Sequence, residues 1–291
     1  MTCRSLGARF FELLFFTGLL VVPMVVSAQV TVEHLRAKIA AGSTEEKRNA
    51  LFEIRNLRTE AAARLAVPLL SDQVEIVRAT AASSIIFLQK DEALKLLVPL
   101  LDDASPFVRR EAASAIGELQ IAAAAPALIE ALRKEKEIEN RSAAAMALGK
   151  AGDPSAIGPL TSILKNRPSE SQEFLRAAAS RSIGEIAQTI RFGKRQEMIP
   201  QNFLPDKYKE KREEISEKTD IASLREIAVP ILRKVIENRR ESADTRRNAA
   251  FALGSIGGSA ALDLLRTYVN SEDPYLAEIC KEALLGAHAN N

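Results

Sequence analysis

Residues 108–117 read VRREAASAIG, and this stretch decides the fold because copies of it recur along the chain. Its Val-Arg pair, Val108-Arg109, is followed by Ala112-Ala113 and then by Ile116-Gly117. Apolar residues three, four and seven positions after the arginine lie on one face of a helix with about 3.6 residues per turn. The stretch therefore predicts an amphipathic helix with small residues on its buried face.

The copies recur at a nearly constant spacing. Successive opening residues are 31, 31, 32, 35 and 70 positions apart, and one further step of 31 reaches Ala277. Apolar residues also recur 23 positions after most of these starts, as at Leu101 and Leu132. This second anchor predicts a second helix in each repeat. The basic residues that open the copies are Lys47, Arg78, Arg109, Arg141, Arg176 and Arg246.

Each repeat is a pair of short helices that cannot bury its own apolar face, so neighbouring pairs must stack into one continuous core. Gly152 follows the copy that Arg141 opens, where a helix end favours a left-handed residue, and Asp153-Pro154 marks the turn. Ser43 and Glu46 have the spacing of a capping box. We predict an all-α fold, an α-solenoid (α-α superhelix) of about six to seven helical hairpins.

The string V-R-x-x-A-A-x-x-I-G, preceded by an acidic residue, resembles HEAT repeats, and specifically the short HEAT-like repeats of the phycobilisome lyase type. The resemblance covers residues 43–291 and implies the fold, while it says little about function. It also implies that the acids and the repeat arginines form hydrogen-bonded ladders between neighbouring repeats, a structural role. The acids six residues before an opening arginine are Asp72, Asp103, Glu135 and Glu170.

The first 28 residues have the pattern of a signal peptide. Arg4 and Arg9 precede an apolar run at 13–26, and Val26-Ser27-Ala28 has the small residues that signal peptidase accepts. The run is shorter than the ~20 residues of a membrane span. We predict cleavage after Ala28, a capping helix at 29–42, no stable membrane span in the mature chain, and a periplasmic or secreted location. The alternative is an uncleaved membrane anchor.

The interval of 70 residues between Arg176 and Arg246 contains an insertion at about residues 191–224. Ile236 fits the closing-helix position of the repeat that Arg176 opens. Insertions in solenoids emerge as loops, which carry function more often than the scaffold does. Phe203 and Tyr208 are the candidate partner contacts in this segment. The alternative is that its apolar residues pack against a neighbouring repeat.

Residues that could perform catalysis are few. Beyond the signal peptide the chain has only His34, His288 and Cys280 as histidine or cysteine, without the spacing of a metal site or a nucleophile–base pair. We expect no catalytic residue, no metal and no cofactor, and thus no enzyme. The resemblance offers one alternative, a lyase or isomerase related to bilin lyases, which work in the cytosol, so the signal peptide argues against it.

In HEAT-type arrays the second helices line the concave side, so the resemblance implies that side chains between their core positions face solvent there. These side chains are mostly basic although the net charge of the whole chain is only +2. The expected partner is another protein, through an acidic peptide or domain, or a polyanionic glycan. These positions include no aromatic residue on which a base could stack, and this argues against nucleic acid as the partner. The alternatives are an ordinary solvated surface and a passive structural envelope protein. The set, here named the second-helix row, is Arg64, Lys95, Glu130, Arg133, Thr161, Ser162, Lys165, Arg233, Lys234, Arg266 and Thr267.

Overall fold

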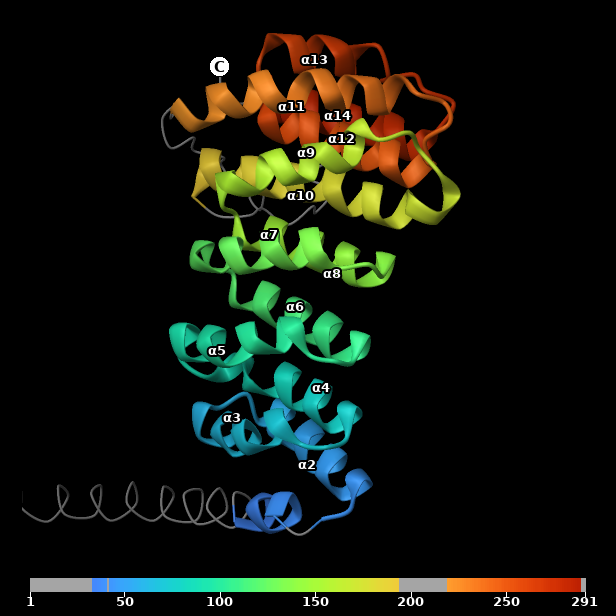
Figure 1. Ribbon diagram of the computed structural model, residues 1–291. Coiled ribbons are helices and arrows are strands. Elements are labelled where there is room, and N and C mark those ends of the chain that lie inside the picture. The colour runs from blue at the N-terminus through green and yellow to red at the C-terminus, as the bar shows by residue number, and fades with distance from the viewer. Residues whose placement is uncertain (1–32, 41, 194–218, 289–291) are drawn as a thin grey trace, which may run out of the picture. The chain divides into compact units, whose positions relative to one another are not determined.

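The computed structural model describes residues 33–40, 42–193 and 219–288, and Figure 1 shows these as helices joined by short turns. No strand occurs within those ranges. The chain divides into two compact units between Leu88 and Gln89, and each unit is described by itself. None of the helices in the described ranges is both long enough and apolar enough to cross a bilayer.

The first unit contains one helical pair and the first helix of the next pair. Residues 33–40 are helical. Helix α2 begins with the predicted capping box, in which the Ser43 backbone N–H donates to Glu46 Oε2 at 2.8 Å and the Glu46 N–H donates back to Ser43 Oγ at 3.3 Å. Helix α2 packs on both α3 and α4. The elements are α2 (Thr44–Leu57), α3 (Glu60–Ala66), η1 (Val67–Ser71), α4 (Glu75–Ser84) and η2 (Ile85–Phe87).

The second unit alternates the two helix types predicted from the repeat. The first helices, which carry the repeat arginines, are α6 (Pro106–Leu119), α8 (Ile138–Ala151), α10 (Glu173–Phe192), α12 (Ala243–Ile256) and α14 (Pro274–His288). The second helices are α5 (Lys90–Leu97), α7 (Ala125–Lys134), α9 (Ile157–Lys165), α11 (Thr219–Glu237) and α13 (Ser259–Arg266). Short 3-10 turns join them at η3 (Val98–Asp102), η4 (Ala122–Ala124), η5 (Pro154–Ala156) and η6 (Glu170–Gln172).

The first helices of the second unit pack directly on one another. Contacts run from α6 to α8, α10, α12 and α14, and among the second helices α11 contacts both α9 and α13. A Cβ on Gly184 of α10 would lie 2.9 Å from the Cα of Ala252 in α12, which shows how close these helices are.

The core follows the sequence pattern. Val108, Ala112 and Ile116 of α6 are buried, as are Leu128 and Leu132 of α7. The all-α solenoid of helical hairpins is thus confirmed.

Helix α11 carries the fully buried Ile236 in its closing part, as expected for the repeat that Arg176 opens. The predicted insertion at about 191–224 falls mostly on 194–218, outside the described residues, and its bounds stay a prediction. The same holds for the signal peptide at 1–28 and for Phe203 and Tyr208.

Candidate interaction surface

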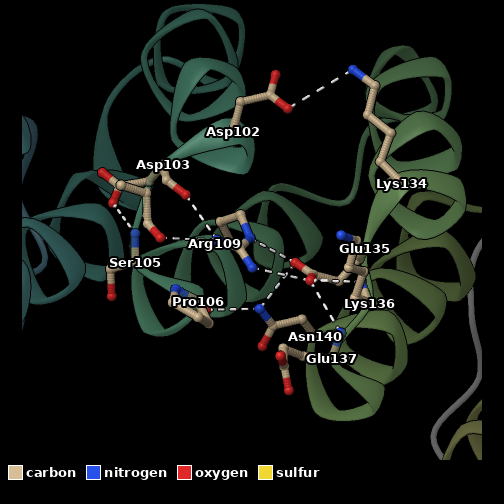
Figure 2. A network of polar contacts seen from close by, with 11 residues as sticks. Asp102, Asp103, Ser105, Pro106, Arg109, Lys134, Glu135, Lys136, Glu137 and Asn140 are labelled. Atoms are coloured by element: carbon tan, nitrogen blue, oxygen red, sulfur yellow. Dashed lines mark hydrogen bonds and ion pairs between the residues drawn. The ribbon is translucent and has the colours of Figure 1, made fainter.

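The turns between repeats are joined by ion pairs, each linking a basic side chain of one first helix to an acid in the next repeat's turn. We name such a contact a ladder pair. In the first unit, Lys47 Nζ lies 2.7 Å from Asp72 Oδ2. In the second unit, Arg109 donates from Nε and Nη2 to the two oxygens of Glu135 at 2.7 and 3.0 Å, as Figure 2 shows.

Arg109 also closes the turn of its own repeat. Its Nη1 donates to the carbonyl oxygens of Asp103 at 2.9 Å and Ala104 at 3.2 Å (Figure 2). Arg78 makes the same contacts in the first unit, to Asp72 O at 2.8 Å and Gln73 O at 3.1 Å. The planar guanidinium can serve both tasks because its five N–H groups point in a fixed fork. The predicted structural role of these arginines is therefore confirmed.

The ladder acid Glu135 is held in its charged form. Burial would raise the pKa of this carboxyl, but hydrogen bonds from Arg109, from Asn140 and from the backbone N–H groups of Glu137 and Lys136 lower it to about 2. Asn140 Nδ2 donates to Glu135 Oε2 at 3.0 Å and to the carbonyl of Pro106 at 2.8 Å, which ties α8 to α6 (Figure 2).

The most buried ladder pair joins Arg176 to Glu241, whose side chains are 1% and 3% exposed. Arg176 Nε donates to Glu241 Oε2 at 3.0 Å, and Nη1 donates to the carbonyls of Ile163 and Asn166 at 2.9 Å each. Glu241 was not among the predicted ladder acids, because it lies 65 residues from Arg176, beyond the long interval. The signal that could have found it is its position six residues before Arg247.

In the next repeat, one arginine closes the turn and a second arginine forms the ladder pair. Arg246 Nε donates to the carbonyl of Ile236 at 2.9 Å, whereas Arg247 donates from Nε and Nη2 to Asp273 at 2.9 and 3.0 Å. The repeat pattern, when aligned on Arg246, therefore identified the arginine that closes the turn. It missed Arg247, the basic residue of the ladder pair. The Arg247 guanidinium also lies 4.8 Å from the centre of the Tyr275 ring.

One expected ladder pair is absent from the described part of the chain. Glu170 begins the short turn η6, is exposed, and makes no ion pair with Arg141 or Arg176. The resemblance implied that Glu170 is a ladder acid, and this is wrong because the turn before α10 is longer than the turns before α4 and α6. Ten residues separate Asn166 from Arg176, against six from Asp103 to Arg109.

The second-helix row is exposed apart from two residues. Thr161 is 1% exposed and its Oγ1 donates to the carbonyls of Ile157 and Gly158 at 2.8 and 3.0 Å, so its predicted solvent-facing position is wrong. Position 161 turns into the core because α9 packs against both α10 and α11. Glu130 is half-buried and paired to Arg133. The exposed members are Arg64, Lys95, Arg133, Ser162, Lys165, Arg233, Lys234, Arg266 and Thr267.

The arginines of this row are already matched by acids on their own helices. Arg64 pairs with Glu60 at 2.9 Å in the first unit, and in the second unit Arg133 pairs with Glu130 at 2.7 Å. The remaining pairs are Arg233 with Glu237 and Arg266 with Asp263. By contrast, no ion pair within the described ranges involves the lysines Lys95, Lys165 and Lys234.

The groups considered for catalysis are inert or isolated. Cys280 is fully buried, and burial raises the pKa of its thiol to about 12, so the reactive thiolate is not formed near neutral pH. His34 is exposed on the helix at residues 33–40. No group of three or more His, Cys, Asp or Glu side chains in the described ranges has the geometry to hold a metal ion.

The comparisons with known proteins agree with the repeat geometry. The family of HEAT repeats matches residues 32–117 and 96–184, and the PBS lyase HEAT-like repeat matches residues 245–271. No curated protein matches the chain.

Two solved structures illustrate the likeness in fold. An engineered protein is 19% identical with a TM-score of 0.53, over 89% of this chain and 69% of its own. The complex of CpcE and CpcF of phycocyanin lyase from Nostoc sp. PCC7120 is 21% identical with a TM-score of 0.49, over 88% of this chain and 87% of its own. The likeness to the engineered protein shows the fold alone. Because the HEAT-repeat match spans more than half of the sequence and the ladder pairs recur at repeat spacing, the chain belongs to the HEAT-repeat family.

Proposed function

We propose that this protein is an exported, periplasmic or secreted HEAT-repeat scaffold without enzymatic activity, and that it binds another protein through the second-helix row. The observation that carries the proposal is the contrast within that row. Its arginines are paired with acids, whereas Lys95, Lys165 and Lys234 are exposed and form no ion pair among the described residues. Unpaired ammonium groups attract acidic partners more strongly than neutralised pairs do.

The three lysines come from different second helices of the second unit. Lys95 lies on α5, Lys165 on α9 and Lys234 on α11. A partner that contacts all three must therefore extend over several repeats, as an acidic segment of a protein would. Cys280 is not available as a nucleophile near neutral pH, because burial raises the pKa of its thiol to about 12.

The test reverses the three charges together, as Lys95→Glu, Lys165→Glu and Lys234→Glu. A partner captured from an envelope fraction by the unaltered protein should be lost with this variant. A matched control reverses three exposed cations outside the row, as Lys90→Glu, Arg239→Glu and Lys281→Glu, and should retain the partner. Equal retention by both variants would remove the row from consideration and leave Phe203 and Tyr208 as the candidate contacts. Failure of the unaltered protein to capture any partner would favour a passive envelope protein.

Export has its own measurement. Mass spectrometry of the protein from its native cells should find a mature N-terminus at Gln29. A chain that keeps residues 1–28 in the cytosol would contradict export, and a chain that keeps them in the membrane would indicate an anchor.

A further inference from the structure

The ladder is interrupted at one step of the second unit. The partners of three ladder pairs stand 25 or 26 residues apart: Lys47 with Asp72, Arg109 with Glu135, and Arg247 with Asp273. The same step from Arg141, which opens α8, reaches Asn166 and Arg167. An amide and a cation therefore occupy the positions at which the other repeats place their acid.

The backbone contacts show that Asn166 is the equivalent of a ladder acid. Its carbonyl oxygen accepts from Arg176 Nη1 at 2.9 Å. The carbonyl oxygen of Asp72, whose carboxylate pairs with Lys47, accepts from Arg78 Nη1 at 2.8 Å. Asp72 Oδ1 also accepts from the Val74 N–H at 2.9 Å, in the turn before α4. The backbone carbonyl of Asn166 thus makes the contact that the carbonyl of a ladder acid makes, but the Asn166 side chain has no carboxylate.

The Arg141 side chain is left available. It is half-buried and makes no hydrogen bond or ion pair with any residue that the structure describes. None of its nitrogen atoms is among the buried atoms without a partner, so the guanidinium is open to solvent. Its neighbour Asn140 bonds to Glu135 and Pro106 in the place where Arg109 and Arg78 bond to their own turns. Arg167 is exposed and likewise has no ion pair in the described ranges.

We propose that Arg141 and Arg167 bind a carboxylate from an acidic segment of a partner protein, which takes the place of the missing ladder acid. The chemistry is that of the neighbouring pair, in which one guanidinium holds both oxygens of Glu135. Phe174, in the first turn of α10 and 61% exposed, offers an aromatic face beside the same turn for the apolar part of such a segment. This inference rests on the proposed partner binding and adds a contact outside the second-helix row.

The experiment restores the missing acid. The substitution Asn166→Asp places a carboxylate of this chain at the position that Asp72 holds in its repeat, so Arg141 gains an internal partner. With the full chain and fluorescein-labelled octaglutamate as the probe, fluorescence anisotropy at low ionic strength should show about tenfold weaker binding. The same variant should raise the thermal unfolding midpoint, because the new ion pair forms only in the folded state. Arg141→Gln should weaken binding similarly without raising that midpoint.

The matched control is Asn270→Asp, which adds the same charge to an exposed position in the turn before Asp273, where the ladder pair is complete. This variant should bind octaglutamate like the unaltered protein. The site is overturned if Asn166→Asp and Arg141→Gln both bind the peptide normally, or if a peptide with glutamine in place of glutamate binds equally well. Loss of peptide binding only in the variant that reverses Lys95, Lys165 and Lys234 would reject this site while keeping the second-helix row.

Discussion

At the scale of single residues, the same backbone position is served by different side chains in different repeats. Arg109 closes its own turn and binds Glu135 with one guanidinium. Among the described residues, Lys47 forms the ladder pair with Asp72 and makes no side-chain bond to the carbonyls of its own turn. In α12, Arg246 closes the turn and Arg247 forms the ladder pair. What the turn requires is a set of N–H donors rather than a fixed residue at a fixed position.

The best-defined prediction at this scale concerns Glu135. Its folded pKa of about 2 lies below the ordinary 4.5, so its carboxylate stabilises the fold fully above pH 4.5. That stability is lost as the pH falls towards 2. Glu135→Gln should lower the free energy of unfolding by about 1–3 kcal/mol at neutral pH. The difference from the unaltered protein should shrink steadily below pH 4.5.

Urea unfolding at pH 7, 4 and 2.5 measures this difference. The control is Glu226→Gln, which removes an exposed carboxylate of α11 and should leave the unfolding free energy nearly unchanged. A pH-independent difference for Glu135→Gln would contradict the assignment of the effect to the charged carboxylate.

At the scale of helices, the glycine that follows the repeat isoleucine or leucine in α6, α8, α10 and α12 sets how closely the first helices approach. A Cβ at Gly117 of α6 would lie 3.0 Å from Ala147 Cα in α8, and one at Gly184 would lie 2.7 Å from the Phe251 ring. These separations are shorter than ordinary contacts, so the helices must move apart to admit a methyl group. The sequence pattern therefore encodes the spacing of the helices as well as their burial.

Gly184→Ala should destabilise the protein even though alanine is the better helix former. The clash with Phe251 and with the Ala252 backbone should cost about 1–3 kcal/mol, which exceeds the gain of up to about 1 kcal/mol in helix propensity. Thermal unfolding followed by circular dichroism measures the result.

Gly158→Ala is the matched control for this prediction. Nothing lies within 4 Å of a Cβ at that position. The gain in helix propensity is offset by the restriction before Pro159, so we expect a change below about 0.5 kcal/mol. A Gly184→Ala protein as stable as this control would show that the first helices separate without cost.

At the scale of the whole molecule, a helical-repeat chain distributes its stability along its length, as a sum of interfaces between neighbouring repeats. The last interface of the second unit depends on the pair between Arg247 and Asp273, next to which Tyr275 packs. Burial would raise the pKa of Asp273, but the hydrogen bonds from Arg247 and from the Leu276 and Tyr275 backbone lower it. The pair thus holds the C-terminal helix α14 to α12.

Asp273→Asn should loosen this end without affecting the middle of the second unit. Hydrogen–deuterium exchange should become faster in α13 and α14, while exchange in α8 stays unchanged. The control Asp263→Asn removes a partner of an exposed pair in the same repeat and should leave exchange in α14 as it was. Equal acceleration in α8 and α14 would show that the array opens as one unit instead.

The sequence predicted local structure well where the signal lies within a few residues. The capping box of Ser43 and Glu46 is present, and Gly152 adopts the left-handed conformation, with φ of 74°, at the end of α8. Predictions about the surface were less successful. Thr161 is buried because α9 lies between α10 and α11, a contact that no spacing within α9 reveals.

The sequence by itself determined the repeat, the two helices of each hairpin and the residues that form their common core, because these depend on a periodicity of about 3.6 residues that every hairpin displays locally. Only the tertiary structure decided which charges meet. It paired Arg176 with Glu241 across 65 residues, left Glu170 outside the ladder and left Arg141 without a partner in the described chain. The physical reason is that an ion pair depends on the length of the turn and the reach of two side chains across neighbouring repeats, and a one-dimensional period contains neither.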